Sequence, residues 1–393
     1  MFKKIILLSL LINTVSCAQK QIINPNEPKT SANSAHMPQT KINNEPEKTI
    51  NQSIAEIINK SKTEKFSKTL ALDVYYVTNR ALNAKASSPC SNESYGIGLG
   101  EQAQYGICRV NVPKKHATGT IESNPDPRAD SHKFFKIINE KKMDFESFQT
   151  QLQKNPYKEV LVFIHGFNVK FQEAVFRASQ IAYDLKFQGS VVLFSWPAGA
   201  ETGFLNNALI SRTYETNKKN AKASLPAALD FFDLISRLEM KTYVYIHSMG
   251  HQVAIPALVN LAKESEVNLL VNELILNAPD FDLRDFESLA PHLLKLAKRI
   301  TLYCSYNDTA MLASETLNGG TRLGACKSIE GVDVINVSEI DNPSFGMGLG
   351  HGYYSSRAVL TDVAQLMMGL EAENRLFIRQ SEPNSTENFY LRP

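Results

Sequence analysis

Short apolar runs alternate with longer segments of helical periodicity through most of the chain beyond about residue 70. Continuous runs rich in β-branched and aromatic residues predict buried strands, whereas apolar residues that recur every three or four positions predict helices. The predicted strands cover residues 70–77, 105–112, 134–138, 160–164, 190–194, 242–246, 273–277, 300–306 and 332–338. The predicted helices cover residues 171–187, 217–238, 251–263, 286–298 and 355–371. Pro226 predicts a kink in the second helix, and Pro256 interrupts the third in a way that the pattern does not explain.

This alternation of strands and helices determines the expected fold class. Strands separated by helices pair in parallel through crossover connections. We therefore expect an α/β fold with a mostly parallel, doubly wound sheet and helices on both of its faces. In such sheets ligands collect at the carboxyl ends of the strands. The chain carries a polar or glycine-containing motif directly after several of its predicted strands, so we expect a functional site at that edge.

The N-terminus has the pattern of an export signal. Lys3 and Lys4 precede an apolar stretch at 5–12 that is too short to span a bilayer, and the segment ends in Ser16-Cys17. It resembles a bacterial lipoprotein signal in which Cys17 becomes the lipidated first residue, although Thr14 stands where an aliphatic residue is usual. We expect an exported protein of the bacterial cell envelope, an outer-membrane lipoprotein that faces the periplasm or the cell surface. Simple secretion and a chance apolar N-terminus stay open as alternatives.

Composition divides the chain into four parts. After the signal peptide at 1–16, residues up to about 50 are rich in Asn, Gln, Pro, Lys, Thr and Ser, which is typical of disorder. We expect a disordered tether at 17–65, with a short helix around 54–58. A folded α/β domain follows at 66–375, and a C-terminal tail at 376–393.

Charge and cysteine content exclude some classes of function. The 393 residues are 43% hydrophobic and carry a formal net charge of +2, which gives no electrostatic reason to expect nucleic acid as a partner. Export permits disulfides, and the local pairings are Cys90–Cys108 and Cys304–Cys326, each worth about 3 kcal/mol. The alternative is four buried free thiols. The spacing of the cysteines fits neither a zinc nor a redox site, so we expect no metal.

Ser248 is the candidate nucleophile. The apolar run at 243–246 ends abruptly in His247-Ser248-Met249-Gly250, and a predicted helix follows. A serine on such a strand-to-helix turn exposes its hydroxyl and faces a helix N-terminus, which favours negative charge. The first glycine of the usual elbow pattern is replaced by Ile246. An ordinary serine at a helix start is the alternative interpretation of these residues taken alone.

A serine nucleophile requires a base and an orienting carboxylate. His351 is the only histidine beyond the last predicted strand, and it lies in a glycine-rich loop at 346–352. Asp308 follows the strand at 300–306 and is the expected acid. Asp280 and Asp282, which follow the preceding strand, are the alternative acids, and Asp280 can instead cap the next helix or stabilise a loop.

Backbone N–H groups are the expected oxyanion donors. Met249 supplies one directly after the nucleophile, and Phe167 supplies the other from a His-Gly loop in which Gly166 permits close approach. A simple β-turn is the alternative for that loop. His165, Trp196 and Tyr353 are candidates for the pocket wall, and the aromatic residues can equally belong to the core.

Taken in order, these motifs resemble a known family. The chain is similar to the α/β-hydrolase superfamily, and more narrowly to a bacterial branch known as α/β hydrolases of unknown function. The matching features are Tyr76-Val77-Thr78-Asn79-Arg80, Tyr105-Gly106, the segment 110–113, Phe163-Ile164-His165-Gly166-Phe167-Asn168, Ser195-Trp196-Pro197, His247-Ser248-Met249-Gly250, Ala278-Pro279-Asp280, Asn307-Asp308 and Gly350-His351. The resemblance implies a serine-hydrolase fold with its triad in the order Ser, Asp, His. It does not name a substrate.

These observations predict a serine hydrolase that acts on a carboxylic ester or thioester through an acyl-enzyme and needs no cofactor. The expected partners are a small-molecule or lipid ester and a membrane, reached through the lipidated N-terminus. Peptidase activity is a lesser alternative. A different class of function also stays open, in which a catalytically silent hydrolase fold serves as an interaction or assembly lipoprotein. The oligomeric state is left open.

Overall fold

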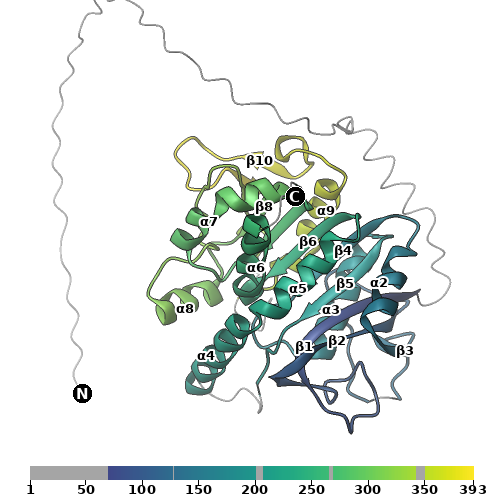
Figure 1. Ribbon diagram of the computed structural model, residues 1–393. Coiled ribbons are helices and arrows are strands. Elements are labelled where there is room, and N and C mark those ends of the chain that lie inside the picture. Colours follow the sequence, from purple (N-terminus) through teal and green to yellow (C-terminus); the bar gives the residue numbers. More distant parts are fainter. Residues whose placement is uncertain (1–69, 127, 201–206, 265–268, 342–349) are drawn as a thin grey trace, which may run out of the picture. The chain divides into compact units, whose positions relative to one another are not determined.

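The computed structural model describes residues 70–126, 128–200, 207–264, 269–341 and 350–393 (Figure 1). All of them belong to one compact unit, Pro46–Pro393. The predicted signal peptide with Cys17, the tether at 17–65 and the short helix around 54–58 lie outside the described residues, as does most of the glycine-rich loop before His351.

In the described residues, one sheet of eleven strands forms the centre of this unit, in the order β10-β11-β9-β8-β7-β6-β4-β5-β1-β2-β3. The strands are β1 (Leu70–Leu82), β2 (Tyr95–Val112), β3 (Lys136–Met143), β4 (Glu159–Ile164), β5 (Ser190–Ser195), β6 (Lys241–His247), β7 (Val271–Asn277), β8 (Ala297–Cys304), β9 (Asp333–Asn336), β10 (Ile378–Gln380) and β11 (Phe389–Leu391). Among the described strands, the neighbours in the sheet between β11 and β1 (β11-β9-β8-β7-β6-β4-β5-β1) pair in parallel. The pairs at the two edges, β1–β2, β2–β3 and β10–β11, are antiparallel. The expected doubly wound, mostly parallel sheet is therefore confirmed.

Helices cover both faces of this sheet. They are α2 (Phe145–Gln153), α3 (Phe171–Asp184), α4 (Asn207–Ala223), α5 (Leu225–Ser236), α6 (His251–Glu264), α7 (Leu283–Leu296), α8 (Thr309–Asn318) and α9 (Arg357–Met367). Buried side chains of α5, α6 and α7 share one core cluster, and those of α3 and α9 share another. The sheet separates the two cores because successive side chains of a strand point to opposite faces.

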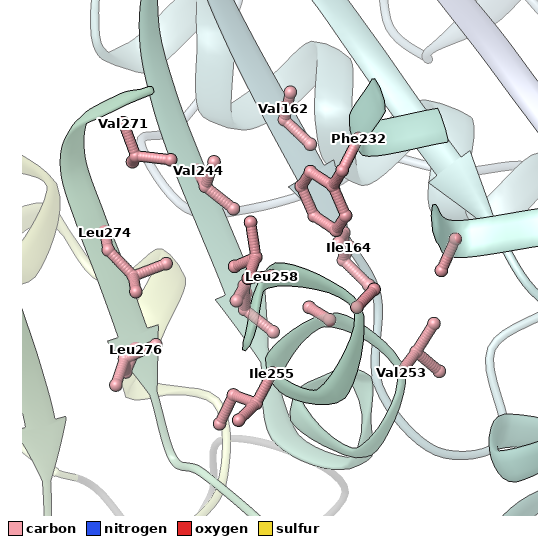
Figure 2. Close-up of a cluster of buried hydrophobic side chains, with 14 of the residues drawn as sticks. Val162, Ile164, Phe232, Val244, Val253, Ile255, Leu258, Val271, Leu274 and Leu276 are labelled. Carbon is pink, nitrogen blue, oxygen red and sulfur yellow. The ribbon is translucent and has the colours of Figure 1, made fainter. Parts of the chain in front are cut away.

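Strand β4 shows how an apolar run produces this arrangement. Val160, Val162 and Ile164 belong to the first core, whereas Leu161 and Phe163 belong to the second. A strand buried on both faces must be apolar at every position, which is the pattern that predicted it. Figure 2 shows the first core, where side chains of α6 lie against those of β4, β6 and β7. The labelled residues are Val162, Ile164, Phe232, Val244, Val253, Ile255, Leu258, Val271, Leu274 and Leu276.

The two prolines within the predicted helices affect the helices differently. The helix predicted at 217–238 is in fact two helices, because α4 ends at Ala223 and Pro226 stands in the first turn of α5. Proline is tolerated there since the first N–H groups of a helix have no partner in the helix. Pro256 lies inside α6, which continues through it.

The ends of the domain differ most from the prediction. Helix α2 was not predicted, since only Phe148 and Leu152 of its residues are buried. The strand expected at 134–138 begins at Lys136 and runs to Met143. Residues 376–393, expected as a tail, contribute β10 and β11 to the sheet, and Leu391 is fully buried. Strands of three residues are too short for periodicity to reveal.

The four cysteines that are described form two disulfides in the structure. Cys90 is joined to Cys108, and Cys304 to Cys326. Within the described ranges no helix is long and apolar enough to cross a bilayer. The same residues include no group of three or more histidine, cysteine or acidic side chains arranged to hold a metal ion.

Candidate active site

The predicted site residues follow strands that are neighbours in the sheet. Strands β8, β7, β6 and β4 lie side by side and run in parallel, so their carboxyl ends share one edge. Ser248 follows β6, the His-Gly loop follows β4, Asp280 follows β7, and Asp308 follows β8. The topology therefore brings together at one edge residues that are far apart in sequence.

Ser248 lies on a sharp turn between β6 and α6. Its φ angle is +53°, in the left-handed region that residues other than glycine rarely adopt. A short 3-10 turn, Ser248–Gly250, leads into α6, and the Ser248 side chain is almost buried, with 4% of the residue exposed. The Ser248 carbonyl accepts a hydrogen bond from His251 Nδ1 at 2.6 Å. The turn is thus held in a strained conformation by contacts around it, as expected for a nucleophile elbow.

Two glycines allow the His-Gly loop to lie against this turn. A Cβ atom on Gly250 would come within 2.6 Å of the His165 carbonyl oxygen, so no larger residue fits there. A Cβ atom on Gly166 would come within 2.7 Å of Ser248 Cβ. The peptide that precedes Phe167 is therefore directly beside the candidate nucleophile, where an oxyanion donor must lie.

Asp308 and His351 are in direct contact. Asp308 Oδ2 and His351 Nδ1 are 2.7 Å apart, and the Asp308 side chain is fully buried. The other carboxylate oxygen, Oδ1, accepts the backbone N–H of Met311 and caps α8. Since a carboxylate accepts, Nδ1 carries the hydrogen and Nε2 is free to act as a base.

His351 also lies next to the Ser248 turn. Its ring is 4.9 Å from the ring of His247, the residue that precedes Ser248, and its carbonyl oxygen is 3.4 Å from His247 Nε2. Among the described residues, Ser248 Oγ forms no hydrogen bond, to His351 or to another group. Hydrogen bonds between catalytic groups are often long before substrate binds, so this geometry is compatible with proton transfer.

The alternative acids have other partners. Asp280 accepts hydrogen bonds from Tyr214 Oη at 2.9 Å and Ser314 Oγ at 2.5 Å, and it lies 3.9 Å from Arg322 Nε. It therefore ties α4 to α8. Asp282 caps α7 by accepting the backbone N–H groups of its first turn. The carboxylate that contacts His351 is that of Asp308.

Three imidazoles surround Ser248, and burial acts to lower the pKa of each, but only His351 has a carboxylate partner that opposes it. Burial lowers the pKa of His247 well below its usual value and that of His251 to about 3, so both stay neutral. Burial also acts to lower the pKa of His351, but the charge and hydrogen bond of Asp308 outweigh it and raise the pKa above 6.5. His351 is thus the only one of the three with the basicity that a general base needs.

The residues expected to line the pocket lie behind the site instead. His165, Trp196 and Tyr353 are at most 1% exposed. The Trp196 ring stacks on His165, and its Nε1 donates to the His165 carbonyl oxygen at 2.8 Å. Tyr353 donates to the carbonyl oxygen of Tyr303. These aromatic residues belong to the core, the alternative that the sequence left open, because no pattern distinguishes a buried aromatic residue from one facing a cavity.

Arg80 is a neighbour of the site to which the sequence assigned no role. It ends the matching feature Tyr76–Arg80 and is only 1% exposed. Its guanidinium contacts Ser195, the last residue of β5, and both His165 and Val169 of the loop after β4. The sequence feature that could have identified Arg80 is its position as an arginine at the end of an apolar strand.

A comparison with known protein families agrees with this fold. Residues 140–369 match the family described as "Alpha/beta hydrolase of unknown function (DUF900)". No curated protein compared with the sequence matches it. Among solved structures, the chain is similar to a "PEG-bound complex of a novel cold-adapted esterase from an Arctic intertidal metagenomic library", with 14% identity and a TM-score of 0.32 over 67% of this chain and 88% of that one. The family match covers more than half of the chain and spans the His-Gly loop, the Ser248 turn, Asp308 and His351. The chain belongs to the family of alpha/beta hydrolases of unknown function, and it has the α/β-hydrolase fold.

Proposed function

We propose that this hydrolase cleaves carboxylic esters with Ser248 as nucleophile, His351 as general base and Asp308 as the residue that orients the base. The observation that carries the proposal is the 2.7 Å contact between Asp308 Oδ2 and His351 Nδ1, next to a serine in a left-handed turn. In that arrangement Nε2 of His351 is the one nitrogen able to accept the Ser248 proton.

The reaction proceeds in two steps. His351 takes the proton of Ser248 as the oxygen attacks the ester carbonyl, and the N–H groups of Phe167 and Met249 hold the oxyanion. The imidazolium then protonates the leaving alcohol, and an acyl-enzyme forms. Water, activated by the same imidazole, attacks the acyl group and restores free Ser248.

Active-site labelling tests this assignment. Wild-type protein is expected to react with a fluorophosphonate probe and to hydrolyse p-nitrophenyl esters, and Ser248→Ala is expected to abolish both. Ser314→Ala is the matched control, since Ser314 is also buried but contacts Asp280 rather than the base. Absence of an adduct on wild type would leave the silent-scaffold alternative, and an adduct that persists in Ser248→Ala would show that Ser248 is not the nucleophile. A panel of esters from acetate to palmitate then defines the acyl chain, and thioester and peptide substrates complete it.

For the location, we propose a lipoprotein anchored through Cys17 in the cell envelope. The basic and apolar segments before Ser16-Cys17 support this proposal, as does the pairing of the remaining cysteines, which requires an oxidising compartment. Cys17→Ala is expected to move the protein from the membrane fraction to the soluble fraction. Mass spectrometry of the N-terminal peptide of wild type should find an acylated cysteine, and an unmodified Cys17 would exclude the anchor.

A further inference from the structure

Arg80 is a buried cation whose hydrogen bonds are all to uncharged groups. In the part of the chain that is described, its guanidinium donates five hydrogen bonds, none of them to a carboxylate. The contrast is Arg375, which is as deeply buried but bonds Asp362 at 2.9 Å and lies 3.5 Å from Asp333. Glu173 attracts the charge of Arg80, but among the described residues no carboxylate forms an ion pair or a hydrogen bond with it. Burying a cation that no carboxylate contacts is costly, which points to a role beyond packing.

The bonds of Arg80 hold the loop after β4 at both ends. Nη2 donates to the Val169 carbonyl oxygen at 2.7 Å and to His165 Nε2 at 3.3 Å. Nε bonds to Ser195 Oγ at 2.9 Å at the end of β5, and Nη1 to the Ala198 carbonyl oxygen at 2.8 Å just beyond it. One planar group therefore fixes the segment between His165 and Val169 against the neighbouring strand end.

The contacts of His165 assign its protons. Nδ1 lies 3.0 Å from the Gly166 carbonyl oxygen, which can only accept, so Nδ1 carries a hydrogen. Burial and the charge of Arg80 lower the pKa of His165 well below its usual value, which keeps the ring neutral. Nε2 is then an acceptor, as its contacts with the Arg80 guanidinium and with Ser195 Oγ at 3.1 Å require.

The Gly166 carbonyl and the Phe167 N–H belong to the same peptide group. A hydrogen bond from His165 to the carbonyl oxygen fixes the plane of that peptide and polarises its N–H, because hydrogen bonds in a chain strengthen one another. That N–H is the proposed oxyanion donor, and Gly166 lies against Ser248. The positive charge of Arg80 acts on the donor through this chain of contacts.

We propose that Arg80 is a positioning residue, which acts through His165 to orient and polarise the Gly166–Phe167 peptide as an oxyanion donor. This inference rests on the proposed serine mechanism. Removing a whole oxyanion donor slows turnover about 10²- to 10³-fold. Loosening one of two donors should therefore lower kcat about 10- to 100-fold and leave KM almost unchanged, since the donor acts on the transition state rather than on the bound ester.

Two variants separate this role from simple stabilisation. In His165→Asn the side-chain amide can still donate to the Gly166 carbonyl, but the link to Arg80 is lost. Arg80→Lys keeps the charge and loses the planar fork. Arg375→Lys is the matched control, because it perturbs a buried arginine whose partners are remote from Ser248.

The measurements are kcat and KM for p-nitrophenyl acetate, the affinity for a phenylboronic acid, and thermal unfolding. A boronic acid forms a tetrahedral anion on the serine, so its affinity should fall in proportion to kcat in His165→Asn and Arg80→Lys. Arg375→Lys should lower the melting temperature and leave both quantities unchanged.

Each outcome decides a different proposal. If wild type does not react with the fluorophosphonate probe, the proposed serine mechanism is wrong and this inference fails with it. Suppose that wild type labels at Ser248 and His165→Asn is folded. If the variant keeps kcat within about threefold, or if its kcat/KM falls only because KM rises while boronate affinity is unchanged, only the inference fails. Should Arg80→Lys not fold, His165→Asn decides alone.

Discussion

The choice between two carboxylates gives the sharpest test of the proposed triad. Asp308 and Asp280 are both buried, both follow parallel strands and both lie near His351. Replacement of each by Asn removes one charge and changes the side-chain volume little. The two variants should nevertheless behave differently, because the oxygens of the two carboxylates have different partners.

In Asp308→Asn, the amide oxygen can still accept the Met311 N–H and cap α8, as Oδ1 now does at 3.1 Å. The amide nitrogen then faces His351 Nδ1, and two donors cannot bond. The imidazole must move its hydrogen to Nε2, where it blocks acceptance of the Ser248 proton, and the imidazolium loses its counter-charge. The comparable change in another serine-hydrolase triad lowers kcat about 10⁴-fold, so we expect a 10³- to 10⁴-fold loss, or about 4–5.5 kcal/mol. Stability should change by less than about 1 kcal/mol, because Asn and Asp cap helices equally well.

In Asp280→Asn the main effect should be on stability. Tyr214 and Ser314 donate to different carboxylate oxygens of Asp280, and the amide of Asn keeps only one of these acceptors. One bond becomes neutral and the other hydroxyl must accept from the amide nitrogen, at about 1 kcal/mol each, while Arg322 loses the anion 3.9 Å away. We expect a loss of about 2 kcal/mol in the free energy of unfolding and a change in kcat of less than about tenfold. The assays are p-nitrophenyl acetate turnover and urea denaturation. Equal losses of kcat, or a larger loss in Asp280→Asn, would show that the acid is misassigned.

Three further predictions concern pH and covalent links. Because the pKa of His351 is raised, kcat/KM should fall on the acidic side with an apparent pKa above 6.5. Asp308→Asn should move this apparent pKa to a lower value, and an unchanged apparent pKa would contradict the assignment of the base. Burial acts to lower the pKa of His116, but its bonds to Asp184 and Glu122 raise it overall, so its stabilisation is complete below pH 6.5 and declines as pH rises through the folded-state pKa. Urea unfolding of His116→Gln should therefore find a loss of about 2–3 kcal/mol near pH 6 and a smaller one near pH 9, and equal losses would refute the linkage. Serine pairs in place of Cys304–Cys326 or Cys90–Cys108 should each cost about 3 kcal/mol, and only the first should also lower turnover, since Asp308 lies within its loop.

The sequence predicted the centre of the sheet well because central parallel strands are apolar at every position. It was less informative at the edges, where one face of a strand meets solvent. In β2, residues before Tyr105 are largely exposed, so the predicted strand began ten residues late. The three-residue strands β10 and β11 form only because neighbouring backbone groups pair with them, which is a tertiary effect.

The candidate site could be predicted only as a set of strand ends. The order of motifs predicted Ser248, Asp308 and His351, and it left Asp280 and Asp282 as alternative acids because they also follow a strand. What separates the acids in the structure is that Asp280 bonds Tyr214 and Ser314, which are 66 and 34 residues away. Contacts of that kind depend on how α4 and α8 cross the edge of the sheet, and no local pattern encodes them.

The charges around Ser248 would favour the proposed proton transfer in a buried site. In the form of the site that can react, Asp308 is negative, Arg80 is positive and His351 is neutral, as His247 and His251 also are. Asp280 lies close to Arg322. Transfer of the Ser248 proton to His351 creates one positive and one negative charge, so the net charge of the region does not change. His247 and His251 do not compete for that proton, because burial keeps the pKa of each far below that of His351. The new cation then lies against Asp308, and the new anion lies beside the peptide that Arg80 and His165 hold. Burial, which penalises any isolated charge, therefore favours the one proton transfer in which both products already have a partner.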